Sequence, residues 1–449
     1  MKNRLTRMNV KEPQKKFLKK QSIKSLLFFP AYFAAMLTSP DALANTMQIW
    51  LAQPTATGNW GGVRSSLQRA GVKIHLDYQG QSGWNISGGK RIGADYNQQI
   101  TLGADWDLHK LLGWPPGGIL HSYVESRAGR SIAKDYVGSN FLPEGLYGSG
   151  ENFRLMDLSY EQQLFSNRLN ILAGYYSLST QFGSLLKLCS NGFMSNAFCH
   201  PQFLGQDTDY QPGPVAEWGG RVKVFLTPAD YVAVGVFEDK PILTHNNQGW
   251  NISPDGAQGA LIPLQLGHTL SIGPMNLVGH YSIGGIIDTI KTSDIEYPHI
   301  LSNGKYAGYI NIDQQLWKAG PYSPRNLMLF TELGMADKKT APETFWLAAG
   351  ISFTGMIPQR PGDILNIGYA RATENSRALD AANAKLRAKH IYDDSLTPAQ
   401  SEIEIGYSIK LAQWFYLTPD FQYLMGVGTR SFQHIPNATV VSLGAKLLF

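Results

Sequence analysis

Apolar and polar residues alternate along several stretches of the chain. In residues 72–79, Val, Ile, Leu and Tyr occupy every second position, and Lys, His, Asp and Gln fill the positions between them. Residues 100–108 and 402–410 repeat this pattern. Successive side chains of a β-strand point to opposite faces, so the alternation predicts strands with one apolar and one polar face. In a soluble sandwich the polar face would lie outside, whereas in a membrane barrel it lines the lumen.

The alternation, together with the turn residues that interrupt it, predicts sixteen strands. Their predicted spans are 72–81, 98–109, 118–127, 152–164, 169–176, 216–226, 231–238, 258–268, 275–285, 307–317, 326–334, 343–353, 363–371, 400–412, 415–424 and 437–449. An even number of strands brings both ends of a bacterial barrel to the periplasmic side of the membrane.

Short and long connections alternate between the predicted strands. The short ones include 165–168, 227–230 and 412–414. The long ones are predicted at 82–97, 128–151, 177–215, 286–306 and 372–399. Short turns on one side and long loops on the other are typical of a barrel with a periplasmic and an external rim. The predicted fold class is therefore all-β, a transmembrane antiparallel β-barrel of 16 strands.

The two ends of the chain indicate export to an outer membrane. Residues 1–44 hold nine basic and two acidic residues, an apolar stretch at 26–37 and the small-residue site Ala42-Leu43-Ala44. Twelve apolar residues are too few to span a bilayer, which favours a secretory signal peptide cleaved after Ala44 over an N-terminal anchor. The chain ends on Phe449, on the apolar face of the last strand. This ending resembles the signature read by the outer-membrane assembly machinery.

These boundaries divide the chain into a signal peptide at 1–44, a periplasmic N-terminal segment at 45–71 and a barrel domain at 72–449. The predicted localisation is the outer membrane of a Gram-negative bacterium. Only 16% of residues are charged, 11% are aromatic and 46 are Gly, which suits a lipid-facing surface with many turns. A soluble all-β protein could share this composition.

The basic residues are concentrated in residues 1–44, which argues against a nucleic-acid partner. Residues 1–44 carry a balance of +7 within a total of +5, so the remainder has a net charge of about −2. A nucleic-acid-binding protein would need a basic face in its mature part. No His-Glu-x-x-His or Gly-x-Ser-x-Gly motif occurs. We therefore expect no enzyme activity, no cofactor and no metal site.

The longest predicted loop, 177–215, contains both cysteines of the chain. Cys189 and Cys199 lie ten residues apart, and an even number of cysteines in an exported protein favours a disulfide. One hypothesis is that the loop folds inward, narrows the pore and is stiffened by this bridge. The alternative is that the bridge only protects an external loop.

The pentapeptide Gly-Trp-Asn-Ile-Ser occurs twice, at 83–87 and at 249–253, and both copies are expected in external loops. A Trp beside an Asn could stack on a sugar and bond to it, but chance is the favoured explanation of the repeat.

A series of short motifs runs in order along the chain. They are Gly58-Asn-Trp-Gly-Gly-Val-Arg64, Lys110-Leu-Leu-Gly-Trp-Pro115, Gly129-Arg-Ser131, Tyr160-Glu-Gln162, Asn196-Ala-Phe-Cys199, Trp218-Gly-Gly-Arg221, Gly279-His-Tyr281, Ile357-Pro-Gln-Arg-Pro361, Pro419-Asp-Phe-Gln-Tyr423 and Ile435-Pro-Asn-Ala438. With them the chain resembles the carbohydrate-selective porins, the OprB-like family. The resemblance implies a sixteen-stranded outer-membrane porin that passes glucose-like sugars by diffusion. Ala173-Gly174-Tyr175 stands where the family pattern has Ala-Gly-Arg, so the sugar preference stays open.

In such a channel the functional site is the constriction, where groups must bind sugar hydroxyls without trapping them. Charged side chains suit this, because Arg and Lys donate hydrogen bonds and carboxylates accept them. Strand parity places seven charged residues in the lumen, and an eighth begins the loop above the third strand. They are Glu125, Arg127, Asp157, Glu161, Glu217, Arg221, Lys223 and, in the loop, Arg130. The alternative is that these charges only solvate the lumen and brace its wall.

The expected partners are small sugars, outer-membrane lipid and the assembly machinery, with a homo-oligomer left open. A general porin or an anion- or phosphate-selective porin is the rival function. An anion channel would need a lumen rich in Arg and Lys, whereas these candidates mix both signs.

Overall fold

The computed structural model describes residues 47–147, 150–183, 185, 192–199, 202–211, 213–388 and 397–449. Leu51–Phe449 form one compact unit, to which the following description refers. The predicted signal peptide and the predicted Cys189–Cys199 disulfide lie outside the described residues.

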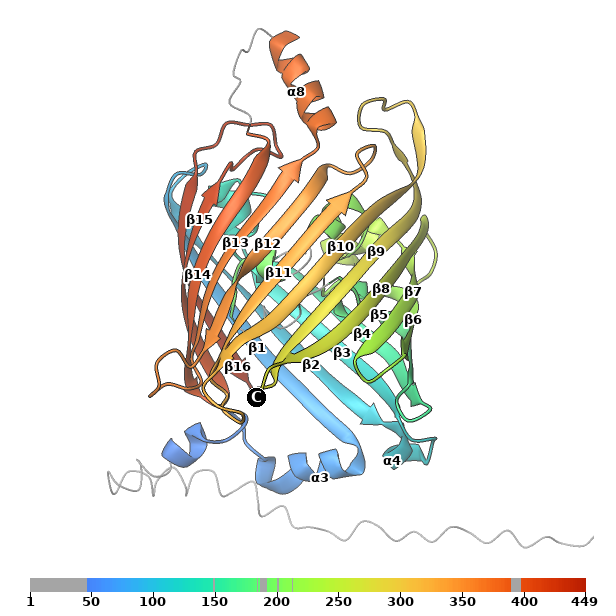
Figure 1. The fold of residues 1–449 in the computed structure, drawn as a ribbon, viewed down its shortest axis with the longest axis vertical. Coiled ribbons are helices and arrows are strands. Elements are labelled where there is room, and N and C mark those ends of the chain that lie inside the picture. The colour runs from blue at the N-terminus through green and yellow to red at the C-terminus, as the bar shows by residue number, and fades with distance from the viewer. Residues whose placement is uncertain are drawn as a thin grey trace, which may run out of the picture. The chain divides into compact units, whose positions relative to one another are not determined.

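The described residues form sixteen antiparallel strands in a closed barrel (Figure 1). The strands are β1 Val72–Ser87, β2 Gly93–Asp107, β3 Gly118–Gly129, β4 Asn152–Leu164, β5 Leu169–Tyr176, β6 Glu217–Phe225, β7 Asp230–Asp239, β8 Gly259–Ile272, β9 Leu277–Ser293, β10 Leu301–Lys318, β11 Asn326–Ala336, β12 Glu343–Thr354, β13 Ile364–Glu374, β14 Ala399–Ala412, β15 Phe415–Met425 and β16 Ala438–Leu448. Each strand pairs with its neighbour in the chain, and β1 pairs with β16 to close the sheet. The predicted fold class is confirmed.

Two predicted external loops, 82–97 and 286–306, are wrong. The pairing of β1 with β2 continues to Asn85↔Gly93, which leaves residues 88–92 as the connection. The pairing of β9 with β10 likewise continues to Ser293↔Leu301. Exposed apolar residues such as Trp84, Ile86 and Ile287 still occur in these strand ends, but the Gly and polar residues among them also fit a loop.

The first Gly-Trp-Asn-Ile-Ser copy is therefore part of β1 and not of a loop. Its Asn85 side chain is buried and donates hydrogen bonds to the carbonyls of Gly88 and Arg91, at 2.8 and 2.9 Å. In the second copy, the exposed Trp250 packs against Phe153 with ring centroids 5.3 Å apart. Neither copy provides a site inside the barrel.

The barrel wall has an apolar outer face and a mixed inner face. Val234 and Val236 on β7 and Leu264 and Leu266 on β8 are exposed, whereas Gln265 is buried inside. The outward residues thus form the surface that a lipid bilayer would cover.

The helices lie before β1 and in the connections between strands. They are η2 Trp60–Gly62, α3 Val63–Ala70, α4 Leu108–Leu112, η3 Ala133–Val137, η4 Gly145–Tyr147, η5 Leu178–Thr180, α6 Asn196–Cys199, α7 Gln202–Asp207, η6 Pro241–Thr244, η7 Asn246–Gln248 and α8 Ser376–Ala388. None of the described helices is long and apolar enough to cross a membrane.

The β5–β6 loop, residues 177–216, lies inside the barrel in its described parts. Gly183 accepts a hydrogen bond from Asn311 on β10, whereas the amides of Met194 and Ser195 bond to Glu404 on β14. Gln81 on β1 also bonds to Met194. A segment that contacts β1, β10 and β14 of a closed barrel must lie within it, as the inward-loop hypothesis predicts.

The β3–β4 loop, residues 130–151, was expected outside but is also folded inward in its described part. Phe141 is fully buried against Trp346 of β12, with ring centroids 5.5 Å apart. The Asn140 side chain bonds to Glu343, also on β12, which lies across the barrel from β3. Apolar residues of this loop and of the β5–β6 loop form one core against the inner wall.

The segment before β1 is helical and contacts the seam of the barrel. Arg64 of α3 donates hydrogen bonds to Thr55 and to the carbonyl of Phe449. The amide of Phe449 donates to the carbonyl of Leu76 at 2.8 Å. The last residue is thereby fixed between α3 and β1.

Candidate functional site

A continuous polar network runs along the inner wall from β2 to β6. We call Asp105, His121, Glu161, Asn170 and Arg221 the lower polar cluster. His121 links two strands, with Nδ1 2.8 Å from Asp105 and Nε2 3.3 Å from Glu161. Asn170 donates to Glu161 at 2.6 Å and accepts a hydrogen bond from Arg221, whose Nη2 lies 3.8 Å from Glu161. Five neighbouring strands thus contribute one linked set of donors and acceptors.

The lower polar cluster borders a cavity of about 610 Å³ beside the β4–β5 and β6–β7 turns. Glu161, Asn170, Arg221 and Lys223 line it from the wall, and Gln181 lines it from the inward β5–β6 loop. The Nε of Arg221 is buried and receives no partner among the described residues. Arg221 thus lines the cavity, while one of its N–H groups lies inside the wall without a hydrogen-bond acceptor among the described residues.

Two further predicted residues adjoin this cluster. The carboxylate of Asp157 accepts a hydrogen bond from Ser159 at 2.5 Å and interacts electrostatically with His121. The ammonium of Lys223 lies over the ring of Tyr231, 4.7 Å from its centroid. The structure thus brings Asp157, Glu161, Arg221 and Lys223 together.

Glu125, Arg127 and Arg154 form a separate upper polar cluster on β3 and β4. Arg127 Nε lies 2.6 Å from Glu125, and its Nη2 donates to Gln99 at 2.8 Å. Arg154 is the cross-strand neighbour of Glu125 and donates to Asn152 at 2.9 Å. All three side chains are almost fully buried. Their mutual contacts fit the bracing role that was weighed as the alternative.

Arg154 was missed because a bulge reverses the parity of β4. The register of β3 and β4 shifts between Tyr123 and Val124, so that Arg154 and Asp157 both point inward. Strict alternation from Asp157 places residue 154 outside. The available signal was the charge itself, since an outward Arg on a membrane strand is costly.

The remaining two predicted residues lie elsewhere. Arg130 is exposed and pairs with Asp135 at 2.6 Å, at the start of the β3–β4 loop. Glu217 is buried at the external end of β6, where it interacts with Asp209 and Asp239 rather than with Arg221. Neither residue belongs to the two polar clusters.

The two inward loops hold each other in place. Gly145 donates to the carbonyl of Met194 at 2.7 Å, and Asn196 and Leu142 exchange hydrogen bonds. Glu144 accepts hydrogen bonds from Ser131 and from the amide of Ala133. Burial raises the pKa of Glu144 to about 7. These contacts make the loops a fixed lining of the lumen.

The tripeptide Ala173-Gly174-Tyr175, which stands where the family pattern has Ala-Gly-Arg, is tightly packed in the wall. Gly174 has a φ of +147°, and a Cβ there would lie 2.4 Å from the carbonyl oxygen of Leu158. Tyr175 packs on Trp218 with ring centroids 5.7 Å apart. An aromatic contact thus occupies the position expected to hold an arginine.

The lower polar cluster offers hydrogen-bond donors and acceptors, with both positive and negative charges, beside the cavity of about 610 Å³. Such a wall can exchange hydrogen bonds with an uncharged solute that carries many hydroxyl groups. Because the groups are already bonded to one another, each contact with a solute replaces an existing one and stays weak, as passage requires.

Comparison with known proteins identifies relatives along most of the chain. The profile of the family described as "Carbohydrate-selective porin, OprB family" matches residues 91–449. Porin B of Pseudomonas aeruginosa is 28% identical over 420 residues, which cover 87% of this chain and 90% of that protein. The putative porin QuiX of Acinetobacter baylyi is 27% identical over 443 residues, covering 93% and 98%.

Solved structures agree with these relatives. The high-pH structure of Pseudomonas putida OprB superposes with a TM-score of 0.83 at 26% identity, over 89% of this chain and 99% of that one. The low-pH structure of the same protein shares the fold, with a TM-score of 0.58 at 20% identity and the same coverage.

Proposed function

Since the chain belongs to the OprB family of carbohydrate-selective porins, we propose that sugars cross its lumen past the lower polar cluster. The protein is an outer-membrane channel through which carbohydrates diffuse.

One observation supports this pathway above the others. The cavity of about 610 Å³ is bounded on one side by Glu161, Asn170 and Arg221 and on the other by Gln181 of the inward loop. A passing sugar would meet hydrogen-bonding groups of both the wall and the loop. Its hydroxyl groups could therefore exchange a hydrogen bond to the wall for one to the loop. The upper polar cluster contributes less, because none of its side chains lines this cavity.

A second candidate function, an anion-selective porin, has one observation in its favour. The cavity is lined by three cationic side chains, Arg168, Arg221 and Lys223, against one carboxylate, Glu161. Asp105 and Asp157, which flank His121 behind this lining, reduce the positive charge of the wall. We therefore place neutral sugars first.

Single-channel recording in planar bilayers separates the two functions. Glucose added at millimolar concentration should interrupt the current through the purified protein in a concentration-dependent way, whereas phosphate should not. Block by phosphate together with no effect of glucose would favour the anion channel and reject the sugar pathway.

We also propose that residues 1–44 act as the cleaved signal peptide and that Phe449 is read during assembly. The exposed Val and Leu residues of β7 and β8 contact lipid. A Cys189–Cys199 bridge, ion conduction and a homo-oligomer stay predictions.

A further inference from the structure

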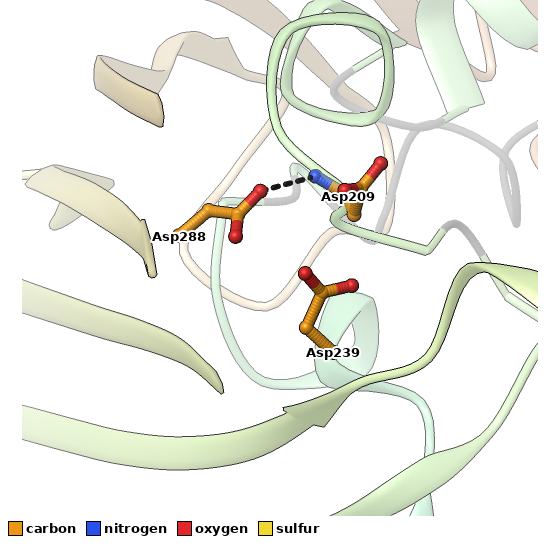
Figure 2. Close-up of side chains that lie close together, drawn as sticks. All are labelled: Asp209, Asp239 and Asp288. Carbon is orange, nitrogen blue, oxygen red and sulfur yellow. Dashed lines mark hydrogen bonds between the residues drawn. The ribbon is translucent and has the colours of Figure 1, made fainter. Parts of the chain in front are cut away.

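Three aspartates meet at the external end of the barrel, outside both polar clusters. Asp239 is the last residue of β7, Asp288 lies in β9, and Asp209 follows α7 in the inward β5–β6 loop. One carboxylate oxygen from each lies within 4.8 Å of the others. Figure 2 shows the three carboxyl groups turned towards a common space, with the Asp209 amide bonded to Asp288 at 3.2 Å.

The cluster carries more negative charge than its neighbours offset. Lys305 on β10 pairs with Asp209 at 2.7 Å and with Asp288 at 3.6 Å. A single ammonium group cannot neutralise three carboxylates. The buried Glu217 lies near Asp209 and Asp239 and adds a fourth carboxyl group to this region.

Asp239 is the aspartate of this cluster whose carboxylate lacks hydrogen-bond donors in the described part of the chain. Its side chain is 0% exposed, and neither carboxylate oxygen receives a hydrogen bond from the described residues. A buried carboxylate without partners is strongly unfavourable. Its orientation towards Asp288 makes the pair repulsive unless a cation or a shared proton lies between them.

We infer that Asp209, Asp239 and Asp288 bind a Ca²⁺ ion that ties the inward β5–β6 loop to β7 and β9. Carboxylate oxygens without Cys or His are the ligands of a hard cation, and Ca²⁺ binds oxygen at about 2.3–2.6 Å. Oxygens up to 4.8 Å apart can therefore share one such ion. Mg²⁺ fits less well, since it requires oxygens at about 2.1 Å in a near-octahedral arrangement.

The ion would act on the pore through the loop. Asp209 is two residues beyond α7, whose Phe203 stacks on Trp346 of β12. Ca²⁺ would thus hold one end of the loop against the wall while Glu404 holds its middle. This consequence rests on the proposed function, whereas the binding of the ion does not.

Terbium luminescence tests the site directly. Tb³⁺ occupies Ca²⁺ sites and emits when a neighbouring aromatic ring transfers energy to it, and Tyr210 adjoins Asp209 in the chain. Folded protein in detergent, stripped with EGTA, should show saturable emission that Ca²⁺ displaces at lower concentration than Mg²⁺. Asp239→Asn should weaken Tb³⁺ binding on the order of tenfold or more, since one charged ligand is lost. Asp380→Asn, on the exposed face of α8, should leave binding unchanged.

Lys305→Met separates a metal site from a plain ion-pair cluster. If Ca²⁺ is the ligand, removal of a competing positive charge should preserve or tighten Tb³⁺ binding. Heat modifiability on gels confirms in each case that the barrel is folded. Equal emission from wild type and Asp239→Asn, or displacement by Mg²⁺ as readily as by Ca²⁺, would overturn the assignment. Absence of emission and of any Ca²⁺-dependent rise in melting temperature in the wild type would mean that protons neutralise the cluster.

Discussion

Replacing residues 181–211 with a short Gly-Ser linker should raise the single-channel conductance several-fold. The barrel wall does not need this segment to close, because its strand pairing is complete without it. The linker can be short, since Gly213 donates to the Ser179 hydroxyl at 2.8 Å. A sixteen-stranded barrel without a plug encloses an aqueous channel, and the aromatic residues Phe193, Phe198 and Phe203 now fill part of it.

The matched control is a similar shortening of the β13–β14 loop, residues 375–398. Its helix α8 rises from the external rim in Figure 1, away from the lumen. This variant should conduct like the parent. Equal conductance of both variants and the parent would mean that the β5–β6 loop does not limit flow.

Arg221→Met should weaken glucose block about tenfold or more and shift the channel towards cations. Arg221 bonds to Asn170 and lies 3.8 Å from Glu161, so its loss leaves the Glu161 charge less offset beside the cavity. A hydrogen bond to a charged group contributes about 1.5–3 kcal/mol, which corresponds to roughly 10- to 100-fold in affinity. Current noise with glucose and reversal potentials in a salt gradient measure the two effects.

Arg130→Met is the control for Arg221→Met, because it removes the same charge from an exposed pair with Asp135. Exposed pairs contribute about 0–1 kcal/mol, so this change should alter neither block nor selectivity. A shift of the same size in both variants would show that overall charge, not the lower polar cluster, sets the behaviour.

The barrel could be predicted from the sequence, because the lipid-facing side of each membrane strand gives an alternating apolar pattern. The spans of β4 and β5, 152–164 and 169–176, were predicted as they occur. The outer ends of β1, β2, β9 and β10 were not, since Gly and polar residues interrupt the apolar alternation there.

The site was only partly predictable. Charge and parity selected Asp157, Glu161, Arg221 and Lys223, but a bulge hid Arg154, and the neutral Asn170 gives no signal of its own. The inward course of the β3–β4 loop had a signal, namely apolar residues such as Ile132 and Phe141 in a stretch expected to face water. The aspartate cluster joins three distant elements, which only the fold brings together.

Liposome swelling with the wild-type protein tests whether the lumen recognises neutral sugars. If the lumen recognises neutral sugars at the lower polar cluster, glucose should enter proteoliposomes faster than a zwitterion of similar size, and faster than a disaccharide. Equal rates for glucose and the zwitterion would contradict sugar recognition at the lower polar cluster and would indicate a general porin.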